Sequence, residues 1–356
     1  MHKLNVCVLF GGISPEHEVS LRSAESVLQN LDPEKYNIIP VGITKDGDWV
    51  RYGGTDYSLL PTGQWLTYPE NRRATISPIR GQGLLCFEGD CVMREMIDVV
   101  FPVLHGENGE DGAMQGLLQM AGIPYVGPHV AESAVAMDKT LTKLVADNAG
   151  VPQAAWLLIR SSELKNRMEA ILEQIEGRFA YPVFVKPAGT GSSVGVSKAL
   201  DRTQLEEALT KAGVYDEKIL VEEFIHGREV EVAVMGNSSP VASVCGEIDS
   251  GAEFYDYDAK YITDTSVAYI PARIDEEVAE QVREQAVKVY SAIGCKGLSR
   301  VDFFVTYEDN RIVFNEINTL PGFTSISMYP KLFAASGIPY GELLDELLKL
   351  AMEAFA

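Results

Sequence analysis

Two segments near the C-terminus carry carboxylates, an amide and a guanidinium at spacings that could bring opposite charges together. Residues 299–305 and 311–318 are rich in β-branched and aromatic side chains and flank a polar turn at 307–310. This pattern predicts a β-hairpin. A turn centred there would pair Asp302 with Glu316 across the two strands.

One face of the second predicted strand carries polar side chains that could bind a ligand. Alternation of side chains along a strand places Glu316 and Asn318 on the same side as Ile312 and Phe314. Opposed carboxylates on an apolar face repel each other, and burying them is costly unless a cation lies between them. Oxygen ligands of this kind suit a hard cation, usually Mg²⁺, shared with phosphate groups. The alternative is that these carboxylates are simply solvated, like most carboxylates on strands.

Two features next to this hairpin could bind an anion. Arg300 places a permanent positive charge two residues before Asp302. Residues 319–325 form a Pro-Gly turn with small polar side chains. The backbone N–H groups of such a loop can approach an anion closely.

The composition is that of a globular protein with more than one domain. At 356 residues the chain is too long for one ordinary core, so two or three domains are expected. The net charge of −21 argues against nucleic-acid binding and against adhesion to an anionic membrane, although local cations could still bind an anionic substrate. No apolar run is long enough for a membrane span, and five scattered cysteines without a C-x-x-C pair suit reduced thiols in the cytoplasm.

The first third of the chain predicts a parallel sheet with covering helices. Its apolar runs are typical of strands buried on both faces. Ser14 followed by Pro15 predicts the N-cap and first turn of a helix that ends near residue 31. Residues 44–96 are harder to interpret. The expected elements are strands at 5–10, 38–43, 99–104 and 125–127, a helix at 112–121 and a small hairpin around 83–92.

The remainder predicts two further α/β units. The helical pattern of 131–149 is followed by Gly150, a residue typical of the position after a helix. Residues 275–293 repeat valine and isoleucine on one helical face. The other expected elements are strands at 184–187, 219–223, 229–235 and 241–244, a strand after residue 195, and helices at 203–212 and 340–354.

A glycine- and serine-rich loop at 189–195 follows the strand that contains Lys186. Its spacing matches neither a P-loop nor G-x-G-x-x-G. Its backbone amides and hydroxyls could still cover phosphate groups, and Lys139 and Lys186 could pair with phosphate oxygens. The alternatives are a flexible turn and ordinary solvated lysines.

Other candidate groups stand at strand ends. Glu16 lies where open α/β sheets bind ligands and could hold an ammonium group, although acidic residues also favour first helical turns. His105 follows another strand and is a candidate site residue, although a single histidine often has only a structural role. Glu222 and Glu223 end an apolar strand, either at a domain crossover or in solvent. The polar aromatic stretch at 255–261 suits a mobile active-site loop or an ordinary surface loop.

These motifs together carry a resemblance that spans almost the whole chain and is weakest at 44–96. They lie at residues 11–20, 104–112, 137–139, 185–195, 254–261, 300–302 and 315–322. In type and order they resemble the D-alanine–D-alanine ligases of the ATP-grasp superfamily.

The resemblance implies an α/β ATP-grasp fold with three α/β domains. An N-terminal parallel-sheet substrate domain would span 1–127, a central ATP-grasp subdomain 128–222, and a C-terminal subdomain with the metal and substrate site 223–356, with ATP between the last two. The enzyme would phosphorylate one D-alanine with ATP and join the resulting D-alanyl phosphate to a second D-alanine. The product would supply peptidoglycan precursors and so maintain cell shape. A cytoplasmic homodimer is expected.

The resemblance also implies roles for single residues. Two Mg²⁺ or Mn²⁺ ions would be held by Asp302, Glu316 and Asn318. The nucleotide would be bound by Lys139, Lys186, Glu222, Glu223, Phe224, Ile225, Glu229 and Lys260. The amino-acid substrates would contact Glu16, His105, Arg300, Gly322, Ser327 and Met328. The expected catalytic set is Glu16, His105, Ser192, Tyr261, Arg300 and Gly322, in which Ser192 and Tyr261 support Glu16 and the last two form the oxyanion hole.

Met328 predicts the second substrate. Many relatives that use D-lactate or D-serine carry arginine at this position, whereas methionine offers an apolar surface suited to a methyl group. D-Alanine is therefore the expected second substrate, and a ligase that joins D-alanine to D-serine or D-lactate is the alternative. A non-catalytic ligand-binding protein would explain the N-terminal unit but neither the acidic hairpin nor the lysines beside glycine loops.

Overall fold

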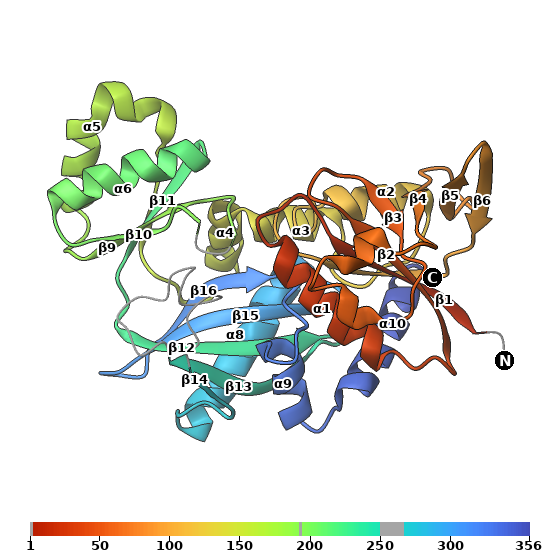
Figure 1. Cartoon of the computed structure of the whole chain (residues 1–356). Helices are drawn as coiled ribbons and strands as arrows, with labels where there is room; N and C mark the ends of the chain where they lie inside the picture. Colours follow the sequence, from red (N-terminus) through yellow and green to blue (C-terminus); the bar gives the residue numbers. More distant parts are fainter. Residues whose placement is uncertain (1–2, 192–193, 250–266) are drawn as a thin grey trace.

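The computed structural model contains three β-sheets with helices packed on them (Figure 1). It describes residues 3–191, 194–249 and 267–356, and the structural statements below concern these residues. In Figure 1 the first sheet lies at one end of the molecule and the small second sheet belongs to a lobe at the other end. The third sheet lies between and below them. The expected α/β fold class is confirmed.

The first sheet has the strand order β6-β5-β4-β3-β2-β1-β7. Its strands are β1 (Leu4–Gly11), β2 (Tyr36–Ile43), β3 (Trp49–Arg51), β4 (Arg72–Ile76), β5 (Leu84–Glu88), β6 (Cys91–Glu95) and β7 (Val99–Leu104), with short 3₁₀ helices at Tyr57–Leu59 and Gln64–Thr67. β1 pairs in parallel with β2 and β7, and the other neighbours are antiparallel.

The expectation of a parallel sheet is therefore correct for β2, β1 and β7 at one end of the first sheet and wrong for the four strands at the other end. Strands β4, β5 and β6 are joined by short connections, which antiparallel pairing permits and parallel pairing does not, whereas a longer segment with the two 3₁₀ helices joins β3 to β4. The hairpin expected around 83–92 is confirmed as β5 and β6. The strand expected at 125–127 is a single bridge between Val100 and Tyr125.

Two expected helices differ from those in the structure: one begins later, and the other is divided into two. Helix α1 (His17–Asn30) starts after the Ser14-Pro15 turn, because the Ser14 hydroxyl accepts a hydrogen bond from the Glu16 N–H and closes a turn instead of capping the helix. The helix expected at 131–149 is two helices, α3 (Val130–Met137) and α4 (Lys139–Ala149). Asp138 separates them, since its backbone is extended and its carboxylate accepts from Thr140 N and Leu141 N as an N-cap. Helix α2 (Ala113–Ala121) agrees closely with expectation.

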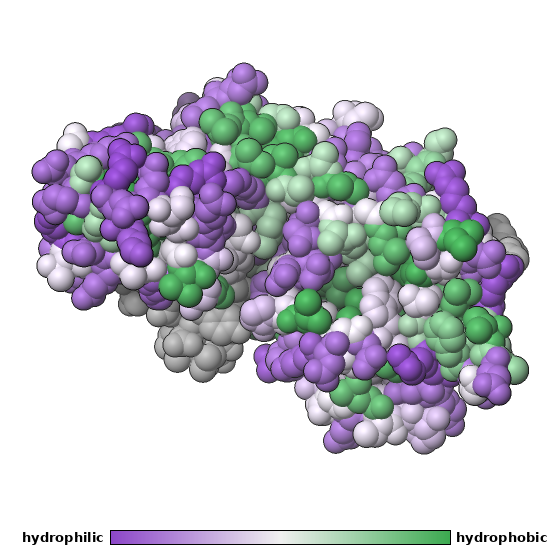
Figure 2. Space-filling model, turned by 90° about the horizontal axis from the view of Figure 1, so that it is seen from above, coloured by the Kyte–Doolittle hydropathy of each residue, from purple (hydrophilic) through white to green (hydrophobic). Residues whose placement is uncertain are grey.

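The second sheet is small and antiparallel. Its order is β10 (Ser197–Ala199), β9 (Val183–Pro187), β11 (Lys218–Glu223) and β8 (Trp156–Arg160). Helices α5 (Ser161–Glu176) and α6 (Arg202–Tyr215) pack against it. The outer face of this lobe is mostly hydrophilic (Figure 2). The sequence pattern gave no expectation for β8 and α5.

The third sheet has the order β14 (Val267–Tyr269), β13 (Val241–Asp249), β12 (Gly227–Met235), β15 (Leu298–Thr306) and β16 (Ile312–Asn318). Helix α8 (Glu276–Ile293) packs against one face through Val282, Ala286 and Val289, in a cluster that includes Val232. Helix α9 (Met328–Ala335) lies on the other face, in a cluster with Ala233.

The last helix joins the C-terminal part of the chain to the first sheet. Helix α10 (Tyr340–Ala354) buries a row of leucines in the cluster that contains β1, β7 and α1. The Tyr36 hydroxyl at the start of β2 donates a 2.7 Å hydrogen bond to Asp345 of α10. This packing places the loops after β1 and β7 beside the loop after β16. None of the helices in the described part of the chain is long and apolar enough to cross a membrane.

Candidate active site

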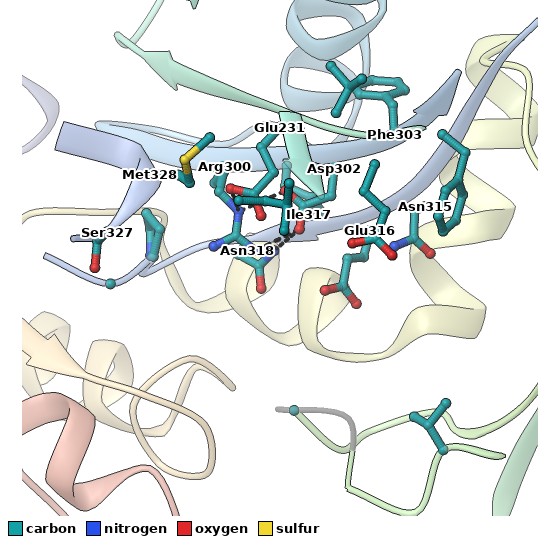
Figure 3. Close-up of a pocket in the computed structure, with 18 of the residues that line it drawn as sticks. Glu231, Arg300, Asp302, Phe303, Asn315, Glu316, Ile317, Asn318, Ser327 and Met328 are labelled. Atoms are coloured by element: carbon teal, nitrogen blue, oxygen red, sulfur yellow. Dashed lines mark hydrogen bonds and ion pairs between the residues drawn. The ribbon is translucent and has the colours of Figure 1, made fainter. Parts of the chain in front are cut away.

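A cavity of about 1990 Å³ is lined by residues from all three sheets. The loops after β1 and β7 contribute Glu16 and His105, the second sheet contributes Lys186 and Glu222, and the third contributes the β15–β16 hairpin. Figure 3 shows part of this cavity, with the hairpin side chains gathered along its wall. Groups from distant parts of the chain therefore meet in one site.

The hairpin has the expected register. Asp302 is paired with Glu316, and Arg300 with Asn318. Arg300 and Asp302 are largely buried, and the Asn318 amide donates a 3.0 Å hydrogen bond to Asp302 Oδ2 (Figure 3). The predicted opposition of two carboxylates is confirmed.

The face expected for the second strand is partly wrong, because the strand contains a bulge. The register shifts between Asp302 and Phe303, so that Asn315 is an extra residue on β16. Ile312, Phe314 and Ile317 pack in the cluster under α8, so Ile317 and not Glu316 or Asn318 continues this face beyond the bulge, although Phe314 also borders the cavity that Glu316 and Asn318 line. Simple alternation fails here because a bulge turns the side chains beyond it to the opposite face.

Arg300 is held between two carboxylates. Its Nε and Nη2 atoms donate to the two oxygens of Asp302 at 2.7 and 2.6 Å, and its Nε lies 3.2 Å from Glu231 Oε2. Burial alone would lower the pKa of Arg300, but Asp302 and Glu231 raise it well above its usual value. A fixed guanidinium at this position can stabilise negative charge in the cavity.

The hairpin has a donor set that fits a hard cation. Asp302, Glu316 and Asn318 offer two carboxylates and one amide oxygen, which suit Mg²⁺ that is also bound by phosphate oxygens. No group of three or more His, Cys, Asp or Glu side chains able to hold a metal occurs among the described residues, so phosphate oxygens would have to complete the shell. Since both Asp302 oxygens also accept from Arg300, a cation would share this carboxylate with the guanidinium.

Two lysines surround the carboxylate of Glu222, a residue of β11 that lines the cavity. Lys143 Nζ lies 2.5 Å from Oε1 and Lys186 Nζ lies 2.7 Å from Oε2. Burial alone would raise the pKa of Glu222, but the two ammonium groups lower it to about 2. Burial alone would lower the pKa of Lys186, but Glu222 raises it above its usual value. Lys186 also donates to Asn315 Oδ1 at 3.3 Å, so it links the second sheet to the bulge of β16.

Lys139 and Glu16 both lie beside the glycine-rich loop. Lys139 Nζ donates a 2.7 Å hydrogen bond to the Thr190 carbonyl oxygen. A Cβ placed on Gly191 would lie 3.2 Å from Glu16 Oε2, so glycine allows this loop to approach the carboxylate. Thr190 and Gly191 therefore lie between a candidate phosphate-binding lysine and a candidate ammonium-binding carboxylate.

His105 connects the loop after β7 to the loop after β16. Its Nδ1 lies 3.0 Å from the Leu320 carbonyl oxygen, which can only accept, so Nδ1 carries the proton. Its Nε2 lies 3.3 Å from the hydroxyl of Ser23, which in turn accepts from the Phe323 N–H at 3.2 Å. Burial lowers the pKa of His105, which favours the neutral tautomer that this geometry requires.

Glu110 reaches the same loop. Its carboxyl accepts hydrogen bonds from Gly106 N at 2.7 Å and Leu320 N at 3.2 Å. Burial, together with the nearby charge of Glu16, raises its pKa to about 8. Both polar groups of the Leu320 residue, its N–H and its carbonyl, are thus bonded by side chains from the loop after β7.

The expected adenine-side residues form one wall of the cavity. Glu222, Glu223, Phe224, Ile225 and Glu229 all line it. The Glu223 carboxylate accepts from Ala155 N at 3.0 Å, which fixes the end of β11 against the start of β8. Lys198 lies 4.4 Å from the centre of the Phe224 ring. A slot with an aromatic side, backbone groups and a carboxylate suits a purine base.

The loop after β16 carries the remaining expected residues. Gly322 lies close to Ser327, since a Cβ at Gly322 would be 2.8 Å from Ser327 Oγ. The Ser327 hydroxyl oxygen accepts from Thr324 N at 3.0 Å. Met328 is the first residue of α9, is 7% exposed, and lines the cavity beside Ser327 (Figure 3).

Comparison with known proteins agrees with this geometry. The family model described as D-ala D-ala ligase N-terminus matches residues 5–128, and the model described as D-ala D-ala ligase C-terminus matches residues 145–349. A D-alanine–D-alanine ligase of Acetivibrio thermocellus is 50% identical to this chain, with 99% of this chain and 97% of that protein covered. The chain belongs to the D-alanine–D-alanine ligase family.

Other relatives of this family agree. A D-alanine–D-alanine ligase of Caldicellulosiruptor bescii is 49% identical over 99% of this chain and 96% of that protein. The structure of the D-alanine–D-alanine ligase from Coxiella burnetii superposes with a TM-score of 0.86 at 35% identity, covering 100% of this chain and 95% of that one. The VanG D-Ala:D-Ser ligase from Enterococcus faecalis superposes with a TM-score of 0.89 at 38% identity, covering 98% of this chain and 100% of that one. The expected ATP-grasp fold and ligase class are confirmed.

Three site residues expected of a D-alanine–D-alanine ligase lie outside the described residues. These are Ser192, Lys260 and Tyr261, and the stretch 255–261 lies outside them as well. The cavity brings the other expected residues together.

Four residues that contact the expected site residues of this ligase, or their loop, were not predicted from the sequence. Lys143, Glu110 and Ser23 contact expected residues or their loop, and Glu231 contacts Arg300. Alternation along residues 229–235 could have placed Glu231 beside Glu229. The other three act through contacts between distant segments, for which the sequence carries no local signal.

Proposed function

We propose that this enzyme joins two D-alanine molecules with cleavage of ATP to ADP and phosphate. The γ-phosphoryl group passes to the carboxylate of the first D-alanine, and the amine of the second attacks the carbonyl carbon and expels phosphate. The observation that carries the proposal is the meeting of the Arg300–Asp302–Glu316 hairpin with Lys186 and Lys139 in one cavity. A carboxylate and a triphosphate can approach each other only where such positive charge is present.

The nucleotide lies in this proposal between the second and third sheets. Lys139 and Lys186, with Lys260, contact phosphate oxygens, and Glu229 accepts from the ribose. Glu222 and the segment Glu223, Phe224 and Ile225 bind the adenine. The support is that the described members of this set line the same cavity.

Two divalent ions, Mg²⁺ or Mn²⁺, are bound in the proposal by Asp302, Glu316 and Asn318. When bound, they neutralise phosphate charge and orient the transferred group. Arg300 keeps its second partner Glu231 while Asp302 faces a cation, so its guanidinium stays in place. The oxygen donors of the hairpin support this role.

The first D-alanine binds with its ammonium group on Glu16, which Ser192 and Tyr261 support. Arg300 and the Gly322 N–H stabilise the oxyanion of the tetrahedral intermediate. His105 shapes this subsite through its bond to Leu320. Ser327 and Met328 line the second subsite.

A second candidate function is ligation of D-alanine to D-serine. The structural match to an enzyme titled D-Ala:D-Ser ligase supports it. Met328 argues against it, because this buried thioether cannot hydrogen-bond an added hydroxyl strongly. D-Lactate carries the same methyl group as D-alanine and a hydroxyl in place of the amine, so Met328 does not discriminate against it, and the product analysis below decides its use.

ADP release measured with D-alanine, D-serine and D-lactate tests the proposal. D-Alanine alone should support turnover, and adding D-serine or D-lactate should yield little mixed product. Absence of D-alanine-dependent ADP release would contradict the proposed function.

The cellular setting is part of the same proposal. The enzyme acts in the cytoplasm, where ATP is available, and its product enters peptidoglycan precursors. The five cysteines are free thiols in the structure, which supports a reducing compartment. It acts as a homodimer, and light scattering at enzyme concentrations near those of the assay tests that assembly.

A further inference from the structure

Lys143 is a buried lysine whose ammonium group reaches the ATP site only through another residue. Its side chain lies on α4, is 1% exposed as a residue, and places Nζ 2.5 Å from Glu222 Oε1. Nζ also lies 3.5 Å from Gln153 Oε1. Glu222 and Lys186 line the cavity, whereas Lys143 is not among the described lining residues. Its effect on a ligand is therefore indirect.

The Glu222 carboxylate has two positive partners for its single negative charge. Lys143 and Lys186 contact one oxygen each, so two cations share one carboxylate. Lys186 also interacts electrostatically with the more distant carboxylates of Glu316 and Glu229. With Lys143 present, Glu222 keeps a counter-ion whether or not Lys186 stays in contact. Without it, any departure of Lys186 would leave a buried carboxylate unpaired, which is strongly unfavourable.

Packing gives no other reason for a lysine at this position. Asp138 caps the start of α4, and Gln153 Nε2 donates to the Lys143 carbonyl oxygen at 2.9 Å in the middle of the helix. An apolar side chain of similar length could fill the same space, and buried ion pairs add little net stability compared with well-packed apolar side chains. The ammonium group is explained by its contact with Glu222.

We propose that Lys143 is a positioning residue, the resident counter-ion of Glu222 that allows Lys186 to leave this carboxylate and bind a phosphate group of the nucleotide. The inference rests on the proposed function in one respect, the contact of Lys186 with phosphate. Lys143 thereby acts on phosphate binding through two other side chains and touches no substrate.

The test measures the affinity of the whole chain for ATP and for adenosine, without D-alanine, by calorimetry and by competition with a fluorescent nucleotide. Lys143→Met should weaken ATP binding about tenfold or more, because Lys186 then has to break the sole ion pair of Glu222. Adenosine has no phosphate and should bind nearly as well as to the wild type. Lys143→Arg, which keeps the charge, should restore ATP affinity.

Two further variants separate this role from general damage. In the Glu222→Gln background the added change Lys143→Met should no longer alter the ratio of ATP to adenosine affinity, since no carboxylate remains to hold Lys186. Lys218→Met removes a lysine of β11 that pairs with Asp138, outside the cavity lining, and should leave the ratio unchanged. Circular dichroism verifies folding, and Lys143→Gln replaces Lys143→Met in the test if the latter does not fold.

The outcomes are distinguishable. An unchanged ATP affinity in folded Lys143→Met or Lys143→Gln protein, or an equal loss of ATP and adenosine binding, would overturn the inference. If Lys186→Met leaves ATP binding intact, the assumed phosphate contact is wrong and the inference falls with it. If the wild type shows no D-alanine-dependent ADP release, the proposed function fails whatever the Lys143 variants do.

Discussion

The Nδ1 atom of His105 lies 3.0 Å from the carbonyl oxygen of Leu320, which joins the loop after β7 to the loop after β16. Ser23 of α1 extends this link, because its hydroxyl contacts His105 Nε2 and accepts from the Phe323 N–H. Gly322 lies between the two residues that are held. The position of its N–H, the proposed oxyanion donor, is therefore set by side chains of the N-terminal unit.

Ser23→Ala should lower kcat about tenfold without a comparable change in the KM for ATP, because an unpaired Phe323 N–H costs about 1–3 kcal/mol and frees the loop beside Gly322. Steady-state kinetics with D-alanine measures the effect. Ser133→Ala is the control, since Ser133 is equally buried and its hydroxyl bonds the Pro128 carbonyl oxygen away from the site. Equal kinetics for the wild type and Ser23→Ala would show that the link does not position the loop.

Asp302→Asn and Glu316→Gln should each lower turnover roughly 100- to 1,000-fold, since they remove charge from the proposed cation site while keeping side-chain volume. The variants should also bind Mn²⁺ more weakly in the presence of ATP, as read by electron paramagnetic resonance. Asp309→Asn changes a carboxylate in the turn of the same hairpin, which bonds Thr306 and Arg311 N, and should have neither effect. Normal Mn²⁺ binding by both site variants would refute the metal assignment.

The stability of the ligand-free enzyme should depend on pH through Glu110. Its pKa is raised from 4.5 to about 8 in the folded protein, so the folded state holds a proton that the unfolded state releases. The stabilising contribution is complete below about pH 4.5 and is lost as pH rises through about 8. Thermal unfolding midpoints measured across this range should fall with pH more steeply for the wild type than for Glu110→Gln. Parallel profiles would show that Glu110 does not hold the proton.

The acidic hairpin could be predicted from local sequence because its groups lie on short periodic segments, whereas the roles of most other site residues were implied by the family resemblance. The register of Asp302 against Glu316 followed from one hairpin and its turn. The bulge at Asn315 could not be predicted, since an extra residue leaves the composition of the strand unchanged and reverses the faces only of the residues beyond it. The division of 131–149 into two helices depends on the backbone of Asp138, whose capping role a continuous apolar pattern concealed.

Contacts between distant segments were beyond the reach of local patterns. Lys143 resembles an ordinary helix lysine until β11 brings Glu222 beside it. Glu110 and Ser23 resemble a loop acid and a helix serine until α10 and β16 place the Leu320 loop against them. Strands β3 and β4 of the antiparallel part of the first sheet were missed for a similar reason, because they are short and separated by an irregular segment.

Met328→Arg should raise the share of D-alanyl-D-serine in a competition of equal D-alanine and D-serine, because a guanidinium can donate to the serine hydroxyl. Chromatographic separation of the dipeptides gives the ratio. Ile326→Arg places the same group on a residue that lines the cavity but is 74% exposed, and should not shift it. An unchanged ratio in Met328→Arg would remove Met328 from the second subsite.

The transfer of oxygen from substrate to phosphate tests the central claim most directly. The enzyme is supplied with ATP, Mg²⁺ and D-alanine labelled with ¹⁸O in both carboxylate oxygens, and the phosphate released is analysed by mass spectrometry. If the carboxylate of the first D-alanine is phosphorylated and the amine of the second then expels phosphate, each phosphate should carry one ¹⁸O atom for each dipeptide formed. Dipeptide formed together with unlabelled phosphate would contradict the account.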